Sequence, residues 1–259
     1  MYVVQDFVGG VSNLADKSYY ALIRRIIPDI EFHQNRYARE LDSCVGQNVR
    51  WLDVGCGVRL HAGWVGPTED SMRARAAYLV GCDVEIEHLR VNQLLSARVG
   101  ADAERLPFTD ASFDLVSANM VLEHLHDPAG VFREVARVLA PGGAFVFVTP
   151  NRWHPAVAAL SLVVAPRWRR FLAHRVEGRA LEHIFLTFYR ANSPGAVHRH
   201  AGSAGLVPER LETFSSYPMF HSPVPLVFLE CLAISAMRWG ALSRFRSNLV
   251  GVLTKPKPT

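Results

Sequence analysis

The chain has 259 residues, of which 49% are hydrophobic and 20% charged, and its formal net charge is +4. This length and composition are typical of a globular protein built around one large domain. The charge is mild, and the Lys and Arg residues form no long blocks, which argues against a nucleic-acid-binding arm. We therefore expect no nucleic acid among its partners.

The four cysteines form neither a CxxC pair nor a zinc-like spacing with histidine. Reduced thiols behave as small apolar residues in a core, so this pattern predicts a reducing, cytoplasmic location. The first ten residues, MYVVQDFVGG, lack a basic segment followed by a sustained apolar run. We expect no signal peptide there.

Helical periodicity dominates the stretch up to about residue 47 and predicts a helical lid or packing segment. Five strands are then predicted, with helical patterns between them, from the apolar runs at 49–55, 78–84, 98–103, 112–120 and 143–151. The clearest helix follows Asp127 as its N-cap and stops at the glycines 142–143. Strands that alternate with helices imply an α/β fold, with a mostly parallel sheet covered by helices on both faces.

The last third of the chain predicts a helix from about Ser193, then strands at 210–217 and 247–255 with a helix at 225–242 between them. We expect no separate second domain. The predicted organisation is a lid segment at 1–47 and a single unit at 48–259. Helical insertions around 152–192 and 223–243 are expected to cover the substrate.

The stretch WLDVGCGVRL raises the question of a ligand, because an acid and two glycines follow a buried strand. The turn at Gly55 and Gly57 lets backbone N–H groups approach a ligand and supplies positive φ. A dinucleotide fingerprint needs a third glycine where this chain has Leu60, so a pyrophosphate ligand is disfavoured.

Carboxylates follow the next two predicted strands. Asp83 ends the second strand, where it can accept hydrogen bonds from both hydroxyls of a ribose. Asp102 ends the third strand, where it can accept a hydrogen bond from the amino group of an adenine. Together with the glycine turn, these acids favour an adenosine that carries something other than a diphosphate.

Four motifs in order resemble the class I S-adenosylmethionine-dependent methyltransferases, in particular their small-molecule, ubiquinone-methyltransferase-like branch: LDVGCG, GCDVEIEHL, DAERLPFTDASFDLVSANMVLEHLHDP and FREVARVLAPGGAFVFVTPN. The resemblance covers roughly residues 49–151. It implies a Rossmann-like, doubly wound sheet of seven strands, mostly parallel with the last strand antiparallel. It also implies S-adenosylmethionine as cofactor and a small or lipid- or sugar-linked metabolite as methyl acceptor, with O-methylation expected first.

The resemblance implies cofactor contacts at the strand ends. The turn under the methionine moiety is expected to consist of Asp53, Gly55, Cys56 and Gly57. Asp83 is expected to hold the ribose.

Further contacts are implied along the same edge. Val84 is expected to pack on the adenine, while Asp102 and Ala103 meet its edge. Asn119 is expected to offer main-chain contacts near the methionine amino group. The N-terminal segment FHQNRYAREL is expected to close over the cofactor, exclude water and bring Tyr37 close to it.

The chain departs from the family pattern at two places. The stretch between Gly57 and Asp83 is longer than usual, and we expect a surface insertion there. Related ubiquinone O-methyltransferases carry an acid just before LEH that helps to hold a metal. This chain has Met120 at that place, so we expect no metal.

Histidines offer candidates for a general base, which is needed only if the acceptor is a hydroxyl or an acidic carbon. His124, in LEH, is the first candidate, and His154, after the fifth strand, is the second. His183 and Tyr189 are candidates for lining the acceptor pocket. Ordinary structural roles in packing or on a loop remain open for each histidine.

Two apolar stretches, 153–175 and 224–246, are joined to Arg and Trp residues. Neither is an uninterrupted apolar span long enough to cross a bilayer. Each fits a cover over the sheet and the acceptor pocket, or a helix that lies on a membrane surface.

Other functions remain open from the residues alone. The same scaffold serves N- and C-methyltransferases, because function depends on the site and not on the fold. A nicotinamide-dependent oxidoreductase and a non-catalytic adenosine-binding protein are the alternatives from other classes.

Overall fold

The computed structural model describes residues 14–61, 69–158, 186–218 and 224–258. The chain divides into two compact units. The first, called the sheet unit here, comprises residues 34–150, 187–212 and 249–259, and the second, the helical unit, comprises residues 1–33, 151–186 and 213–248. The sequence suggested a division near residue 47. The units instead separate at residue 33, because the helix that follows packs within the sheet unit.

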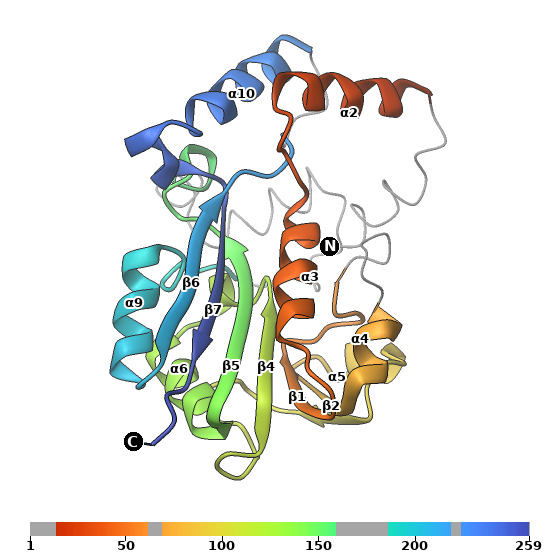
Figure 1. Cartoon of the computed structure of the whole chain (residues 1–259), viewed down its shortest axis with the longest axis vertical. Coiled ribbons are helices and arrows are strands. Elements are labelled where there is room, and N and C mark those ends of the chain that lie inside the picture. Colours follow the sequence, from red (N-terminus) through yellow and green to blue (C-terminus); the bar gives the residue numbers. More distant parts are fainter. Residues whose placement is uncertain (1–13, 62–68, 159–185, 219–223, 259) are drawn as a thin grey trace. The chain divides into compact units, whose positions relative to one another are not determined.

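A seven-stranded sheet has the order β3-β2-β1-β4-β5-β7-β6 (Figure 1). Its strands are β1 (Val49–Val54), β2 (Ala76–Asp83), β3 (Ala97–Gly100), β4 (Phe113–Asn119), β5 (Leu139–Pro150), β6 (Val207–Phe214) and β7 (Asn248–Thr254). Strands β1 to β5 pair in parallel. β7 runs antiparallel to β5, since the N–H of Gly142 donates to Lys255 O at 2.7 Å and that of Lys255 donates to Gly143 O at 2.9 Å. The predicted fold class is confirmed.

One face of the sheet packs on helices α6 (Pro128–Val138) and α9 (Pro194–Ser203). Side chains alternate between the two faces along each strand. Leu52 and Val116 point into this core, where they meet Phe132 of α6. All three side chains are fully buried, so this face supplies the larger apolar core of the sheet unit.

The opposite face carries α3 (His33–Cys44) and a buried group of polar side chains. Trp51 Nε1 donates a hydrogen bond to Ser117 Oγ at 2.8 Å, and Ser117 Oγ donates to the carboxyl of Asp53. Tyr37 of α3 lies beside this group and is fully buried. This face therefore joins the predicted lid helix to the strand that leads into the glycine turn.

Helix α6 begins where it was predicted, directly after Asp127, but differs at its C-terminal end. It ends at Val138 and not at the glycines, because Leu139 already belongs to β5 and pairs with Phe113. Asp127 occupies the N-cap position as predicted, but its side chain makes no capping hydrogen bond. Its carboxylate lies instead 3.8 Å from the guanidinium of Arg133.

The stretch predicted as a surface insertion contributes to the core. Residues 62–68 lie outside the described residues, but α4 (Glu69–Arg75) packs on β2 and buries Met72 completely. His61, before the gap, is also buried. Helix α5 (Ile86–Val91) follows the second strand end and contacts β2 and β3.

The helical unit contains α2 (Leu14–Ile26), α10 (Val224–Ala236) and the short 3₁₀ helix η3 (Gly240–Phe245). α2 and α10 pack on one another through a small apolar core of Ile23, Ile27, Ile30, Val227, Cys231 and Ile234. Most of the predicted apolar stretch at 153–175, and His183, lie outside the described residues. In the described part of the chain, no helix is long and apolar enough to span a membrane.

Candidate functional site

The turn after β1 has the backbone that its glycines predict. Gly55 and Gly57 have φ values of +61° and +50°, in the left-handed region that favours glycine. A Cβ on Gly55 would lie 2.5 Å from Val121 Cγ2, so this glycine is required for close packing against the chain after β4. A Cβ on Gly57 would meet nothing within 4 Å, which leaves open space above the turn.

Asp83, at the end of β2, is bound to this turn through its carboxylate. It accepts a hydrogen bond from the N–H of Gly57 at 2.9 Å and another from the N–H of Glu85 at 2.8 Å. Cys56, in the middle of the turn, is buried and donates its N–H to Cys82 O at 3.2 Å. The turn and the carboxylate therefore form one preorganised group.

The end of β3 lies next to Asp83, because Asp83 pairs with Gly100 in the parallel register. Asp102 follows two residues later and is exposed, and its carboxylate accepts the N–H of Glu104 at 2.9 Å. Val84 is 59% exposed, an unusual state for a valine that follows a buried strand. The structure thus gathers the glycine turn, Asp83, Val84 and Asp102 at one edge of the sheet.

Asp53 lies in a different environment from Asp83. Its side chain is 1% exposed, and this burial raises its pKa to about 8, against the lowering effect of the hydrogen bond from Ser117. The negative charge of Asp83 raises the pKa further. Burial also raises the pKa of Tyr37 well above its usual value, with Asp53 adding to the effect. At neutral pH the Asp53 carboxyl is therefore mainly protonated.

Asn119, at the end of β4, is tied to α3 through its side chain. Its Nδ2 donates to Gln34 Oε1 at 2.9 Å and to Leu60 O at 2.8 Å, while Gln34 Nε2 donates back to Asn119 Oδ1 at 3.1 Å. The sequence suggested main-chain contacts for this residue and gave no partner for its amide. The structure shows that the first turn of α3 holds it.

The chain after β4 turns sharply and enters a short 3₁₀ helix, η1 (Leu122–His124). Met120 has a φ of +56°, and its N–H donates to Val148 O at 2.9 Å. This strained turn brings Glu123 inward and leaves the side chain of His124 31% exposed.

A buried polar network surrounds Glu123. Thr149 Oγ1, at the end of β5, donates to Glu123 Oε2 at 2.8 Å, and Asn192 Nδ2 donates to Thr149 Oγ1 at 2.6 Å. Burial raises the pKa of Glu123. Its second carboxyl oxygen lies 3.9 Å from His124 Nε2, so the partly exposed histidine lies next to a buried acid that is held in place by hydrogen bonds.

The second candidate base lies in the other unit. His154 belongs to the helical unit, is 9% exposed, and has a pKa lowered by burial. Its Nδ1 is buried and has no hydrogen-bond partner among the residues that the structure describes. Tyr189, proposed from the sequence for the pocket, has a φ of +53° and donates its N–H to Glu123 O at 3.2 Å.

Several site residues were missed from the sequence: Gln34, Ser117, Glu123, Thr149 and Asn192. Ser117 and Thr149 carried a signal, since each is a polar residue within the apolar part of a strand, and a buried polar group needs a partner. Glu123 stands beside the predicted His124 and could have been found as its neighbour. Gln34 and Asn192 lie on helix and loop patterns that gave no such signal.

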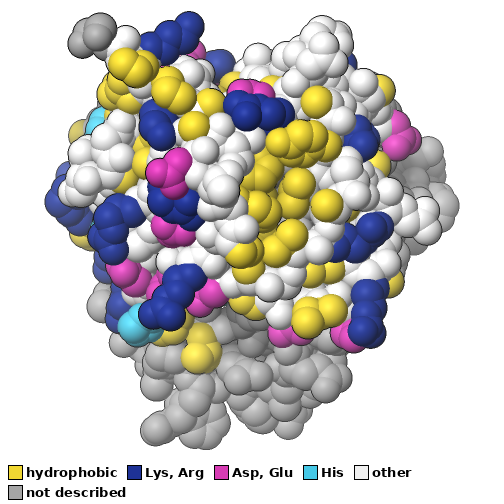
Figure 2. Space-filling model, turned by 90° about the horizontal axis from the view of Figure 1, so that it is seen from below, with side chains coloured by type: hydrophobic (Ala, Val, Ile, Leu, Met, Phe, Trp, Pro, Cys, Tyr) yellow, Lys and Arg dark blue, Asp and Glu magenta, His cyan; other side chains and the backbone are white. Residues whose placement is uncertain are grey.

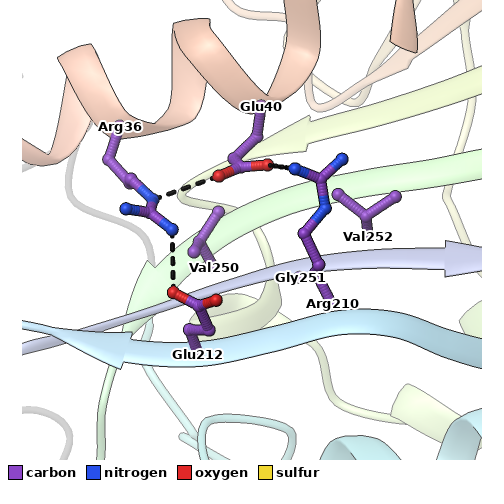
Figure 3. A pocket seen from close by; sticks show the side chains of 7 residues that line it. All are labelled: Arg36, Glu40, Arg210, Glu212, Val250, Gly251 and Val252. Carbon is purple, nitrogen blue, oxygen red and sulfur yellow. Dashed lines mark hydrogen bonds and ion pairs between the residues drawn. The ribbon is translucent and has the colours of Figure 1, made fainter. Parts of the chain in front are cut away.

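A shallow pocket between α3 and β6 of the sheet unit is lined by charged side chains (Figure 3). Arg36 and Glu40 point down from α3, and Arg210 and Glu212 point up from β6. Arg36 binds Glu40 at 3.1 Å and Glu212 at 2.8 Å, while Arg210 binds Glu40 at 2.8 Å. We call these four residues the ionic staple. Their alternating charges satisfy one another and hold α3 against the edge strand.

The described residues offer little for a metal or a nucleic acid. No group of three His, Cys, Asp or Glu side chains is gathered as a metal site in the described ranges. On the face shown in Figure 2, basic and acidic side chains are intermixed around a central group of hydrophobic ones. The charges visible on that face therefore give no argument for a nucleic-acid partner.

Known proteins share sequence with the part of the chain that carries this site. A family model described as a methyltransferase domain matches residues 52–147. A ubiquinone biosynthesis O-methyltransferase of Pseudomonas putida is 32% identical over 171 residues, which are 63% of this chain and 67% of that protein. A probable S-adenosylmethionine-dependent methyltransferase of Mycolicibacterium smegmatis is 35% identical over 146 residues, 55% of this chain and 49% of that protein. The matches thus span about half to two thirds of these relatives.

Solved structures share the fold at lower identity. An S-adenosylmethionine-dependent methyltransferase of Mesorhizobium loti aligns with a TM-score of 0.55 and 21% identity, over 83% of this chain and 94% of that one. A geranyl diphosphate methyltransferase in complex with S-adenosylmethionine aligns with a TM-score of 0.53 and 16% identity, over 85% of each chain. A Haloferax volcanii protein, solved with a methyltransferase activator, aligns with a TM-score of 0.58 and 20% identity, over 93% and 97%.

Proposed function

Because the chain belongs to the class I S-adenosylmethionine-dependent methyltransferase family, we propose that it methylates a hydroxyl oxygen of a small, lipid-linked or sugar-linked metabolite. The family and its cofactor, S-adenosylmethionine, confirm two predictions made from the sequence. The choice of oxygen is supported by relatives named as O-methyltransferases.

The observation that carries this proposal is the arrangement at the ends of β1, β2 and β3. Asp83 is held by the N–H of Gly57, and Asp102 is exposed after the next strand. We propose that Asp83 accepts hydrogen bonds from the ribose and that Asp102 accepts one from the adenine amino group. Ala103 follows Asp102 and is half-buried.

The residues present fit an adenosine-bearing cofactor. Space is open above Gly57, and Val84 offers an exposed apolar surface beside Asp83. We propose that the main chain of residues 55–57 and Asn119 flanks the methionine moiety. Once bound there, the cofactor supplies an electrophilic methyl group on a sulfonium sulfur.

Methyl transfer is an in-line displacement. The acceptor oxygen forms a bond to the methyl carbon while the carbon–sulfur bond breaks, and the sulfur keeps the electron pair. Alignment of these atoms can supply roughly 7–11 kcal/mol of the barrier. The hydroxyl proton must also leave, and we propose that His124 accepts it, which would add ~10²- to 10⁴-fold in rate.

Helix α3 is proposed to cover the cofactor and to exclude water from the reacting atoms. Its support is the burial of Tyr37 and the pairing of Gln34 with Asn119. Hydrogen exchange should slow across residues 33–41 when S-adenosylhomocysteine is added. Identical exchange with and without that product would contradict the lid.

Titration calorimetry with S-adenosylmethionine, S-adenosylhomocysteine and NAD tests the proposed activity at its first step. We expect both adenosyl sulfur compounds to bind and NAD not to bind. Binding of NAD alone would favour the oxidoreductase. If the cofactor binds, mass spectrometry of acceptors incubated with a deuterated methyl donor identifies the atom that is methylated. Label on nitrogen or carbon would replace the oxygen acceptor, and label on no acceptor would favour an adenosine-binding protein.

A further inference from the structure

The helical unit ends in a helix that is apolar on more than one side. One side of α10 packs against α2 through Val227, Cys231 and Ile234, which are 8%, 1% and 4% exposed. This side completes the small core of the unit. It accounts for only part of the apolar surface of the helix, whose sequence is VPLVFLECLAISA.

The outer side of α10 is exposed although it is apolar. Phe228, Leu229 and Leu232 are 53%, 61% and 48% exposed, and their spacing places them on one side of the helix. The exposed apolar surface continues beyond the helix with Trp239, at 77%, and Leu242, at 45%. A helix that is apolar nearly all round is normally buried or in contact with lipid.

The length of α10 limits how lipid could be met. The helix has 13 residues, and a bilayer-spanning helix needs about 20. It can therefore lie on a membrane surface but cannot cross one. In this orientation the outer side chains would enter the boundary between headgroups and acyl chains.

The helical unit carries an excess of basic residues, which favours anionic lipid. Among its described side chains, Arg238 binds Asp29 at 2.9 Å, and the other charged ones are Arg24, Arg25, Arg152, Arg244 and Arg246 against Glu31 and Glu230. Arg244 is exposed next to the 3₁₀ helix end, with its guanidinium 4.7 Å from the ring centroid of Phe245. Trp beside Arg at an apolar edge is typical of a membrane–water interface.

We propose that the outer side of α10, extended by Trp239 and Leu242, docks on the surface of an anionic phospholipid bilayer. The surface belongs to the helical unit, and the proposal does not depend on the proposed methyl transfer. A second copy of the chain is the competing occupant of the same side chains, and the experiment separates the two.

Co-sedimentation of the full chain with vesicles tests the proposal. We expect binding to phosphatidylcholine vesicles that contain phosphatidylglycerol, weaker binding to phosphatidylcholine alone, and loss of binding as salt is raised. The double variant Leu229→Ser, Leu232→Ser should bind at least ~10-fold less, because two apolar side chains no longer enter the lipid. Val91→Ser is the matched control, since Val91 is 60% exposed on α5 of the sheet unit.

A charge variant and a second apolar variant complete the test. Arg244→Gln should weaken binding to the anionic vesicles only, whereas Arg90→Gln, on α5, should leave it unchanged. Trp239→Ser replaces the double variant if circular dichroism shows that the latter is unfolded. The proposal is overturned if wild type binds neither kind of vesicle. It is also overturned if the folded apolar variants bind the anionic vesicles as strongly as wild type does. Light scattering measures the oligomeric state of the same proteins. If wild type is a dimer that does not bind vesicles, and the apolar variants are monomers, the surface binds a second copy of the chain instead of lipid.

Discussion

The turns after β1 and after β4 lie at neighbouring strand ends but hold their acids in different ways. After β1, a backbone group holds the acid, since the N–H of Gly57 donates a hydrogen bond to the carboxylate of Asp83. After β4, side chains from distant parts of the chain hold the acid, since Thr149 and Asn192 form the network around Glu123. The first turn is thus a local motif, whereas the second depends on the completed fold.

The two turns are also in contact, and the contact explains why one glycine is so constrained. Gly55 leaves no room for a Cβ because Val121 packs against it. A shift of the chain after β4 would therefore move the glycine turn as well.

The largest expected effect is on the free energy of unfolding, and it tests whether Asp53, in the strand that leads into the first turn, is protonated. The pKa of Asp53 rises from 3.8, its ordinary value, to about 8 in the folded protein, so folding takes up a proton between these pH values. Stability should therefore fall as pH rises through this window, by roughly 5 kcal/mol at pH 8. Asp53→Asn cannot ionise and should escape this loss. Urea unfolding of the two proteins from pH 4 to 8 measures the difference.

An opposite-sign control is available for that measurement. Asp114 has its pKa lowered by the hydrogen bond from Arg50, so its contribution to stability is lost as pH falls. Asp114→Asn should therefore lose slightly less stability than wild type when the urea series is extended below pH 4, and the difference should be small because the side chain is 38% exposed. Parallel curves of stability against pH for wild type and Asp53→Asn would show that Asp53 is not protonated at neutral pH.

The next effect is on catalysis and belongs to the second turn. His124→Ala should lower kcat by ~10²-fold or more with little change in cofactor affinity, because only proton transfer is lost. His126→Ala is the neighbouring control, and His154→Ala tests the other candidate base. Steady-state kinetics on the identified acceptor gives the answer. If kcat of His124→Ala equals that of wild type, His124 is not the base, and the positioning of the reactants accounts for the rate. That result is expected if the acceptor is an amine or an ionised phenol.

The third expected effect is on the affinity for the cofactor and tests Asp83, which is bound to the first turn. Asp83→Ala should weaken S-adenosylmethionine binding by roughly 1.5–3 kcal/mol, because hydrogen bonds involving a charged group are lost. Glu87→Ala, on the exposed side of α5, should leave affinity unchanged. Calorimetry compares the three proteins. Equal affinity for wild type and Asp83→Ala would remove Asp83 from the site.

The contrast between the two turns also explains what the sequence could predict. The glycine turn, Asp83 and Asp102 were found because each follows a recognisable apolar strand within one short motif. The strands were found for the same reason, although β5 begins four residues before the predicted run. The N-cap position of Asp127 was predicted, but not the absence of its capping hydrogen bond, because that depends on a side-chain geometry that a residue type alone does not determine.

The second turn could not be predicted in this way. Thr149 lies 26 residues from Glu123, and Asn192 lies 43 residues from Thr149, so no local pattern joins them. Gln34 and Asn119 are 85 residues apart. The division at residue 33 has a similar cause, because the contacts of α3 with the sheet are made by residues distant in the chain.

The smallest effect tests whether the ionic staple supports α3, and through Gln34 the end of β4. Glu212→Gln breaks only the contact of Arg36 with a half-exposed carboxylate, since Glu40 remains paired with Arg36 and Arg210. An exposed ion pair contributes about 1 kcal/mol or less, so unfolding in urea should change by no more than that. Glu209→Gln, on the same strand, serves as the charge-matched control. Because the contact is screened by salt, the difference between Glu212→Gln and wild type should shrink as ionic strength rises. A loss of more than about 2 kcal/mol, unaffected by salt, would mean that the staple acts as a buried network, and that α3 depends on it more than on its apolar contacts with the sheet.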